Sequence, residues 1–461
     1  MCWLMACAPS FFRCNVFVPF DDEDLMIRML RPLACSLSGL AVLAFGQTPA
    51  MEASHGAQTL QFVIVLTRHG VRSPTSKPGR YDGYSAAPWP AWSVPPGDLT
   101  RHGFALMKLF GAFDRASLAS EGLLPPSGCG GANRVAILAD SDERTRETGK
   151  ALAEGMFPGC TLAVQALPTD DSDPLFHAMH AGVGRPNAAL ERAAIEGSIG
   201  GNAAGLSEVY RPQLEALDHI LAGCGRTAVT NPRRSSIFSV PVDQTQAKSD
   251  HGASLHGPLS TASSMAETLL LEYAEGLRGG SLGWGCLNEA NLREVMQLHA
   301  AETDFTQRIP AVARVNGSNL LDHIVDALTR SASGNPVPDA PDKPGDRVLF
   351  LVGHDNNIAS VAGLLDLHWI IDGRRDDTPP GGALLFELWR STDGAWFVRV
   401  YYTAQSLRQM REATPLTLAQ PPERVPVFVP GCSLPDMSCA LDSFASTARA
   451  VVDPAYVSHS D

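Results

Sequence analysis

Three short apolar segments constrain the fold of this chain more than any other feature. They are QFVIVL, RVAILA and RVLFLV, at residues 61–66, 134–139 and 347–352. Continuous apolar runs of this length, rich in Val and Ile, are typical of strands that are buried on both faces of a sheet. Segments with helical periodicity follow them, at residues 103–124, 143–157 and 356–367. Strands that alternate with helices predict an α/β fold with a mostly parallel central sheet flanked by helices.

Two further patterns extend this predicted sheet. Residues 162–167 have the composition of another short strand. Residues 383–390 and 396–402 are both rich in aromatic and aliphatic side chains, and the short connection STDGA joins them. Two such segments separated by a few turn-forming residues are typical of a β-hairpin. We therefore expect an antiparallel pair near the end of the chain.

The middle of the chain has a different composition. Residues 186–222 and 259–330 are rich in Ala, Leu and Glu at helical spacing, whereas residues 225–258 between them are polar and irregular. This pattern predicts a large all-α insertion at 186–330, broken by a loop. A linker rich in Pro, Gly and Asp follows it, and then strand patterns return. The α/β domain is accordingly expected to comprise residues 55–185 and 331–461.

Residues 1–50 have the pattern of a signal or targeting segment. Basic residues lie between Met26 and Arg31, and an apolar stretch extends from Leu33 to Phe45. This stretch is of signal-peptide length and too short to span a membrane, and no later segment reaches spanning length. The acidic run DDED at 21–24 does not suit the start of a signal peptide, so translation is expected to begin at Met26 or Met29. The protein is thus predicted to be periplasmic or secreted.

Six cysteines follow this targeting region, and an even number in an exported chain favours disulfides over a zinc site. Cys129 with Cys160, and Cys432 with Cys439, are the natural local pairs because each pair is close in sequence. Cys224 and Cys286 remain, and their pairing rests on elimination alone.

The ends of the three apolar segments carry the charged residues. Arg68, His69 and Arg72 follow the first, Arg144 follows the second as a helix opens, and His354 and Asp355 follow the third. Ligands of α/β sheets bind beyond the carboxyl ends of the strands. The chain has a formal net charge of −13, so clustered arginines indicate a local anion site rather than a basic surface for nucleic acid.

A phosphoryl group fits this cluster of arginines and histidines. Guanidinium groups bind phosphate oxygens bidentately, and a neutral imidazole on His69 can attack phosphorus. Two neighbouring cations should lower the pKa of His69 and keep it neutral in mild acid. Asp355 is the candidate general acid for the leaving alkoxide. No metal or other cofactor is expected, because the sequence has no His, Asp and Glu at metal-ligand spacing.

Simpler structural roles compete for other residues near the strand ends. Asp140, Asp142 and Glu143 are interpreted as helix caps and arginine partners. His177 and His180, together with His102, are interpreted as surface or structural residues. A lone RHG after a strand could be a salt-bridged turn, but its pairing with GHD and DERT after two other strands favours the phosphate site.

With these motifs in place, the chain resembles the histidine acid phosphatases, and particularly their bacterial phytase members. The likeness rests on RHGVRSPT and GHDNN and extends from about residue 60 to 445. It includes the tryptophan spacing at 88–92, DERTRETG, SDPLF, GWG, DDTPPGGALLFELWR and LRQMREATPL. The resemblance implies a phosphoglycerate-mutase-like α/β core and a two-step reaction through a phosphohistidine on His69.

The resemblance also implies roles for residues outside the strand ends. Arg68, Arg72, Arg144 and His354 would hold the scissile phosphate, and Asp355 would donate the proton. Thr75, Glu267 and His299 match positions that line the pocket of such phytases, and a role as ordinary helix residues is the weaker alternative for Glu267 and His299. Asn356 departs from the small or hydroxyl residue that relatives often carry. Cys224 lacks the nearby partner of related phytases, which leaves a bond to Cys286 or a free thiol.

The sequence therefore supports a small-molecule phosphomonoester as substrate and a monomeric enzyme. Inositol hexakisphosphate is the leading substrate, and a broad acid phosphatase or glucose-1-phosphatase is the alternative. GVRSPT favours phytase, because glucose-1-phosphatases of the family usually depart from it. A non-catalytic phosphate-binding relative is disfavoured because binding alone would need neither His69 nor Asp355.

Overall fold

The computed structural model describes residues 57–169, 171–224, 231–248, 252–335 and 340–458. The expected targeting segment 1–50 and the two alternative start sites lie outside these residues. From residue 55 onward the chain is one compact unit by its internal contacts. Within the described part, none of the helices is both long and apolar enough to cross a bilayer.

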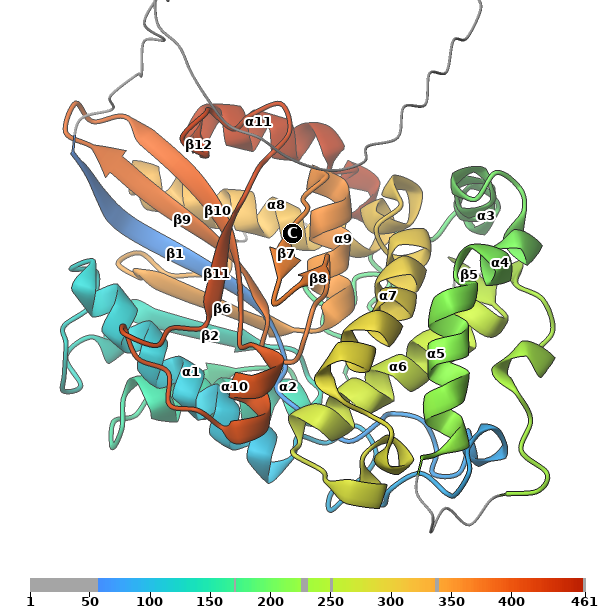
Figure 1. The fold of residues 1–461 in the computed structure, drawn as a ribbon. Helices are drawn as coiled ribbons and strands as arrows, with labels where there is room; N and C mark the ends of the chain where they lie inside the picture. Colours follow the sequence, from blue (N-terminus) through green and yellow to red (C-terminus); the bar gives the residue numbers. More distant parts are fainter. Residues whose placement is uncertain (1–56, 170, 225–230, 249–251, 336–339, 459–461) are drawn as a thin grey trace, which may run out of the picture. The chain divides into compact units, whose positions relative to one another are not determined.

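An eight-stranded mixed sheet forms the centre of the fold (Figure 1). Its strand order is β11-β10-β9-β1-β6-β2-β3, and β12 pairs with β10 at one end. The strands are β1 (Gln58–Arg68), β2 (Val135–Ala139), β3 (Val164–Gln165), β6 (Val348–Gly353), β9 (Ala383–Ser391), β10 (Trp396–Ala404), β11 (Glu423–Val427) and β12 (Ser438–Ala440).

The α/β class is confirmed, but the sheet is mixed rather than mostly parallel. β3, β2, β6 and β1 are parallel, whereas β9 to β12 pair antiparallel. The sequence did not predict β11, because its segment ERVPV has two charges and a proline in five residues. Such a strand is tolerated only at a sheet edge, and β11 is one of the two strands at the ends of the strand order.

Side chains alternate along β1 and supply two hydrophobic layers. Phe62, Ile64 and Leu66 pack on the face covered by α8 (Pro310–Ser333), α9 (Asp355–Leu365) and α11 (Leu441–Val451). Val63 and Val65 pack on the opposite face, under α1 (Arg101–Ser120) and α2 (Glu143–Met156). Figure 1 shows these two helical layers on either side of the strands. Because β1 is buried on both faces, its carboxyl end is held in a fixed position.

A second hydrophobic core lies in the helical region. It is built mainly by α5 (Arg211–Ala222), α6 (Pro258–Ala274) and α7 (Glu289–Thr306), with α3 (Ala188–Ser198) and the short α4 (Leu206–Val209) beside them. The expectation of an all-α insertion was wrong in one respect. Part of the predicted loop forms a hairpin of β4 (Gln244–Lys248) and β5 (Gly252–His256), and α3 packs against this hairpin.

Most of helix α8 packs with the sheet side of the molecule, although Val312 near its start packs against Ile195 of α3. Its residues Leu321, Ile324 and Leu328 are fully buried in the same cluster as Phe62 of β1. A helix takes its place from the surface against which its apolar face packs, and that surface cannot be read from the periodicity of the helix. The remaining short elements are β7 (Ile370–Ile371), β8 (Arg374–Arg375) and α10 (Leu407–Glu412).

Three disulfides link the six cysteines that follow residue 50. Cys129 pairs with Cys160, Cys432 with Cys439, and Cys224 with Cys286. The two local pairings are confirmed, and Cys224 pairs with Cys286 rather than remaining a free thiol. Cys286 directly follows the GWG segment, whose Trp284 packs in the helical core. That packing brings together two cysteines that are 62 residues apart in sequence.

A buried glutamate of α6, Glu272, leads us to predict that the free energy of unfolding falls as the pH rises from acidic to neutral. Glu272 is fully buried, and its Oε2 accepts a hydrogen bond from the Gly283 backbone N–H at 3.1 Å, while Oε1 has no partner among the described residues. Burial raises the pKa of Glu272 to about 8, and the Gly283 hydrogen bond only partly offsets this. Between its ordinary pKa of 4.5 and about 8, the folded chain holds a proton that the unfolded chain releases.

We therefore expect Glu272→Gln to be more stable than the wild type at pH 7.5 and equally stable at pH 4.5. A raised carboxyl pKa costs the folded state up to about 1.4 kcal/mol per pH unit across this window. Urea unfolding of both proteins at several pH values would measure the difference. Glu215→Gln on the exposed side of α5 is the control and should leave the pH dependence unchanged. Parallel pH profiles for wild type and Glu272→Gln would contradict the prediction.

Candidate active site

The charged strand ends meet because three parallel strands end side by side. Arg68, the last residue of β1, is opposite Gly353, the last residue of β6. His69 donates its backbone N–H to Gly353 O at 2.9 Å, and Asp140, which follows β2, donates to Val352 O at 3.0 Å. The register thus brings the RHG, DERT and GHD motifs to one edge of the sheet.

His69 lies in this edge as a buried, oriented imidazole. The residue is 2% exposed, and Nδ1 lies 2.8 Å from Gly70 O. A carbonyl oxygen only accepts hydrogen bonds, so Nδ1 carries the proton and Nε2 keeps its lone pair. Burial and the charges of Arg68 and Arg72 lower the pKa of His69 well below its ordinary value. His69 is therefore a neutral base with Nε2 available as a nucleophile.

Arg68 and Arg72 form a cationic pair that one carboxylate bridges. Arg68 is fully buried and donates to Thr378 O at 2.7 Å. Its Nη2 also binds Glu267 Oε1, and Arg72 Nη2 donates to the same oxygen at 2.8 Å. Glu267, from α6, is thereby brought against two motif arginines that are 199 and 195 residues away in sequence. Burial raises the pKa of Glu267, but the charges of Arg72 and Arg68 outweigh burial and the net shift is downward.

Asp355 opens α9 and contacts the same nitrogen of Arg68 as Glu267 does. Its Oδ2 lies 3.0 Å from Arg68 Nη2, and Oδ1 accepts from the Asn356 backbone N–H at 2.8 Å. Burial acts to raise the pKa of Asp355, but Arg68 and then His299 outweigh it and the pKa lies below its ordinary value. A phosphate dianion beside Arg68 would offset that positive charge and favour a protonated Asp355.

Arg144 and His354 extend the cationic cluster. Arg144 Nη2 lies 3.4 Å from His354 Nδ1 and 2.5 Å from Asp142 Oδ2. The rings of His69 and His354 lie edge to face with centroids 5.5 Å apart. Of the nine residues predicted for the site, Arg68, Arg72, Arg144 and His354 therefore gather around His69, and the charge of each lowers its pKa.

Two residues that were interpreted as structural also reach this cluster. Asp140 is fully buried, and its Oδ2 accepts hydrogen bonds from His354 Nε2 at 2.8 Å and His177 Nε2 at 3.1 Å. The carboxylate thus orients His354, with Nε2–H toward Asp140 and Nδ1 toward Arg144. The position of Asp140 directly after a strand was a usable signal, but nothing local marks His177.

His299 and Thr75 occupy different positions around the pocket. His299 Nδ1 is 3.0 Å from Ser263 Oγ, and its charge acts on Asp355 and Glu267. Thr75 is exposed. Gly97 lies between Thr75 and Arg144: a Cβ built on this glycine would lie 3.6 Å from Thr75 Cγ2 and 3.7 Å from Arg144 Nη1. Glu267 and His299 thus come from the helical region, whereas Thr75 lies at the rim.

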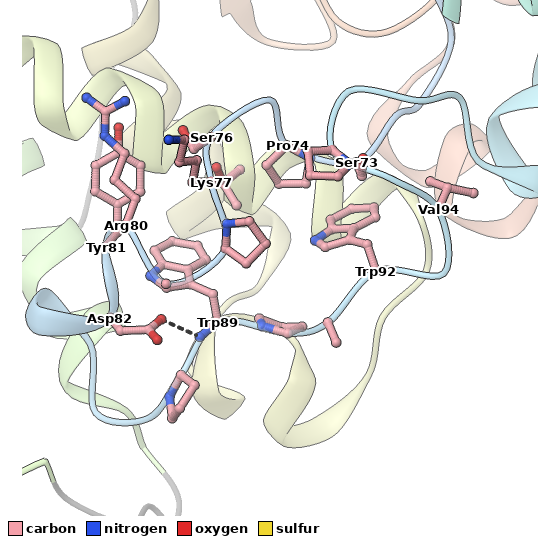
Figure 2. A pocket seen from close by; sticks show the side chains of 17 residues that line it. Ser73, Pro74, Ser76, Lys77, Arg80, Tyr81, Asp82, Trp89, Trp92 and Val94 are labelled. Carbon is pink, nitrogen blue, oxygen red and sulfur yellow. Dashed lines mark hydrogen bonds between the residues drawn. The ribbon is translucent and has the colours of Figure 1, made fainter. Parts of the chain in front are cut away.

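An aromatic cavity of about 390 Å³ adjoins the RHGVRSPT segment (Figure 2). Tyr81, Trp89 and Trp92 line it together with several prolines, and Ser73 and Thr268 extend it toward Arg72 and Glu267. Figure 2 shows the indole ring of Trp92 beside Pro74, and the backbone N–H of Trp89 bonded to Asp82. The tryptophans at 88–92 therefore form a wall beside the candidate site.

Comparison with known proteins agrees with this geometry. The family model described as histidine phosphatase superfamily (branch 2) matches residues 59–198 and 253–403. Phytase AppA of Escherichia coli is 34% identical over 411 residues, which cover 86% of this chain and 93% of that protein. Glucose-1-phosphatase of Salmonella typhimurium is 30% identical over 89% of this chain and 97% of that protein.

A solved structure extends the likeness to three dimensions. Hafnia alvei phytase, in a structure with myo-inositol hexakis sulphate, matches with a TM-score of 0.79 at 34% identity. The match covers 87% of this chain and 99% of that one. The mixed sheet, its helical layers and the helical region are therefore shared with a phytase.

Proposed function

The chain belongs to branch 2 of the histidine phosphatase superfamily and is a histidine acid phosphatase, and on this premise we propose that it is an exported phytase. The proposed reaction removes phosphate from inositol hexakisphosphate without a metal or other cofactor. The enzyme is proposed to act as a monomer in the periplasm or outside the cell. Three disulfides support export, because such bonds persist in oxidising compartments.

One observation carries the proposal: a neutral imidazole, His69, lies among three arginines, and its Nε2 has no hydrogen-bond partner in the part of the chain that the structure describes. The Gly70 carbonyl holds Nδ1–H, so the lone pair of Nε2 has one defined direction. Arg68, Arg72 and Arg144 supply the positive charge that a phosphoryl group needs. A site for binding alone would not require a histidine kept neutral in this way.

In the proposed first step, His69 Nε2 attacks phosphorus as the P–O bond to the inositol breaks. The arginines and His354 stabilise the charge on the phosphoryl oxygens. Asp355, protonated when the bound phosphate offsets Arg68, gives its proton to the leaving alkoxide. The products of this step are the alcohol and a phosphohistidine.

In the proposed second step, water attacks the phosphohistidine. Asp355, now a carboxylate, takes the proton of that water, and the P–N bond breaks. Inorganic phosphate is released, and His69 returns to the neutral form with its proton on Nδ1. Asp355 thus acts as acid and then as base, so each proton is accounted for over the cycle.

The choice of phytate as the substrate is a proposal. The related proteins support it, but they do not by themselves distinguish phytate from glucose 1-phosphate. Related proteins include a phytase and a glucose-1-phosphatase at similar identity. Phytate is favoured because the Hafnia alvei enzyme binds its sulphate analogue and because this chain retains GVRSPT. Glucose 1-phosphate and broad phosphomonoesters remain the alternative.

Comparison of three substrates tests this choice. We expect kcat/KM for phytate to exceed the values for glucose 1-phosphate and p-nitrophenyl phosphate, each measured as phosphate release in mild acid. A higher kcat/KM for glucose 1-phosphate would favour the alternative function. Equal values for all three substrates would indicate a broad acid phosphatase.

His299 is proposed to contact a non-reacting phosphate of phytate. It lies on α7 of the helical region, with Ser263 holding Nδ1, while Nε2 has no partner among the described residues. We expect His299→Ala to raise the KM for phytate several-fold in mild acid. The KM for p-nitrophenyl phosphate should change little. A loss of similar size on both substrates would place His299 in the catalytic core, consistent with its charge acting on Asp355.

A further inference from the structure

We propose that Asp140, Asp142, His177 and His354 form a binding site for one divalent transition-metal ion, of the Cu²⁺ or Zn²⁺ class, behind the phosphate pocket. One nitrogen or oxygen of each residue lies within 4.8 Å of the others. The four residues come from three separate parts of the chain. Asp140, Asp142 and His354 follow strands at the sheet edge, and His177 follows the SDPLF segment. This site is additional to the phosphatase reaction and is not required by it.

The distances between the donor atoms suit a small ion. His354 Nε2 and His177 Nε2 lie 2.8 and 3.1 Å from the same Asp140 oxygen, and Asp142 Oδ2 lies 3.5 Å from His354 Nε2. Ligands at about 2.0–2.2 Å from zinc or copper are separated by similar distances, so only small movements are needed. The ion would take the place of the Nε2–H protons, and each neutral imidazole would carry its proton on Nδ1 instead.

The surroundings of Asp140 supply a second observation. Its side chain is fully buried at the end of β2, and Oδ1 has no hydrogen-bond partner among the described residues. A buried carboxylate oxygen without a partner is costly, and a bound cation or its water would satisfy it. Thr145 Oγ1 donates to Asp140 O at 2.8 Å and holds the backbone in place.

The donor types decide which ions fit. Two imidazoles and two carboxylates provide nitrogen and oxygen ligands, which favour Cu²⁺ and Zn²⁺ over Mg²⁺ or Ca²⁺. Arg144 opposes binding, because its Nη2 lies 2.5 Å from Asp142 and must release it. Among the described residues, the second group of this kind, His219 with Cys224 and Cys286, is excluded because both cysteines are in a disulfide.

The site would share a residue with catalysis. His354 Nδ1 faces Arg144 and the phosphate pocket, while Nε2 faces the proposed ion. A ligand on one nitrogen changes the proton and orientation of the other, so metal and phosphate binding are coupled through this ring.

Electron paramagnetic resonance of the full chain with Cu²⁺ at pH 6.5 tests the site. We expect one equivalent of Cu²⁺ with two imidazole nitrogens, and displacement by Zn²⁺. His177→Gln should remove the coupling to one imidazole nitrogen from the spectrum. It should also lower the affinity for this one Cu²⁺ ion by at least about tenfold. Ions held by other groups of the chain would not change in this variant, so the difference isolates the proposed site.

His102→Gln is the matched control, because His102 lies on α1 and contacts Met410 O instead of the cluster. It should keep both nitrogens and the wild-type affinity. Circular dichroism of each variant checks that the fold is retained. The same two-nitrogen spectrum and affinity in His177→Gln, or no stoichiometric Cu²⁺ in the wild type, would overturn the proposal. Neither result depends on phosphatase activity.

Discussion

Replacing His69 with alanine is expected to abolish phosphoryl transfer and to lower kcat for every phosphomonoester by at least about 10⁴-fold. The reason is that Nε2 of His69 is the atom proposed to form the bond to phosphorus, with Nδ1 held by Gly70 O at 2.8 Å. The measurement is rapid-quench labelling with a ³²P-phosphomonoester, followed by steady-state kinetics. The wild type should show protein-bound phosphate that is labile to acid and stable to alkali.

His354→Ala serves as the matched comparison for this experiment. His354 lies next to His69, with ring centroids 5.5 Å apart, but is proposed to bind the phosphate rather than to attack it. This variant should therefore label slowly, whereas His69→Ala should not label at all. Labelling of His69→Ala at an unchanged site would show that another residue is the nucleophile.

Replacing Asp355 with asparagine should have the second largest effect, and its size should depend on the leaving group. The alkoxide leaving from phytate or an alkyl phosphate needs a proton, whereas p-nitrophenolate is stable without one. We expect a loss of about 10²- to 10⁴-fold in kcat for alkyl phosphates and of less than about tenfold in the first step for p-nitrophenyl phosphate.

The same variant separates the two proposed roles of Asp355. Burst kinetics with p-nitrophenyl phosphate measure the formation and the hydrolysis of the phosphohistidine separately. Asp355→Asn should form the intermediate readily and hydrolyse it slowly, because the base for water is lost. Equal losses on alkyl and aryl substrates in the first step would argue that Asp355 acts by its 3.0 Å ion pair with Arg68 instead.

Retention of the pocket in Asp355→Asn needs a separate check. Asp355 balances part of the charge of Arg68, and its removal could change phosphate affinity. Competitive inhibition by inorganic phosphate measures that affinity directly. A similar inhibition constant in both proteins would assign the kinetic loss to proton transfer.

Local patterns were sufficient to predict the strand ends of the site. The apolar segments at 61–66, 134–139 and 347–352 became β1, β2 and β6, extended or shifted by a few residues. A strand buried on both faces has a strong local signal, and parallel strands end at one edge of their sheet. Arg68, His69 and His354 could thus be assigned to one location before their contacts were known.

Contacts with the helical region could not be predicted in the same way. Helical periodicity marks Glu267 and His299 only as residues of α6 and α7, and the family resemblance was needed to select them. Their approach to Arg68 and Asp355 depends on how α6 and α7 pack against the loops after β1. Packing between elements is a property of whole surfaces, which no short window of sequence contains.

The sequence by itself determined the α/β class, the cationic strand ends and the two local disulfides, because each depends on residues that are close in the chain. Tertiary structure alone decided that Glu267 bridges Arg68 and Arg72, and that Cys224 meets Cys286. It also decided that His177 and His354 share one oxygen of Asp140, across separations of 37 and 214 residues. Burial of these charges, which sets their pKa values and hydrogen-bond partners, exists only after the sheet and helices have packed together.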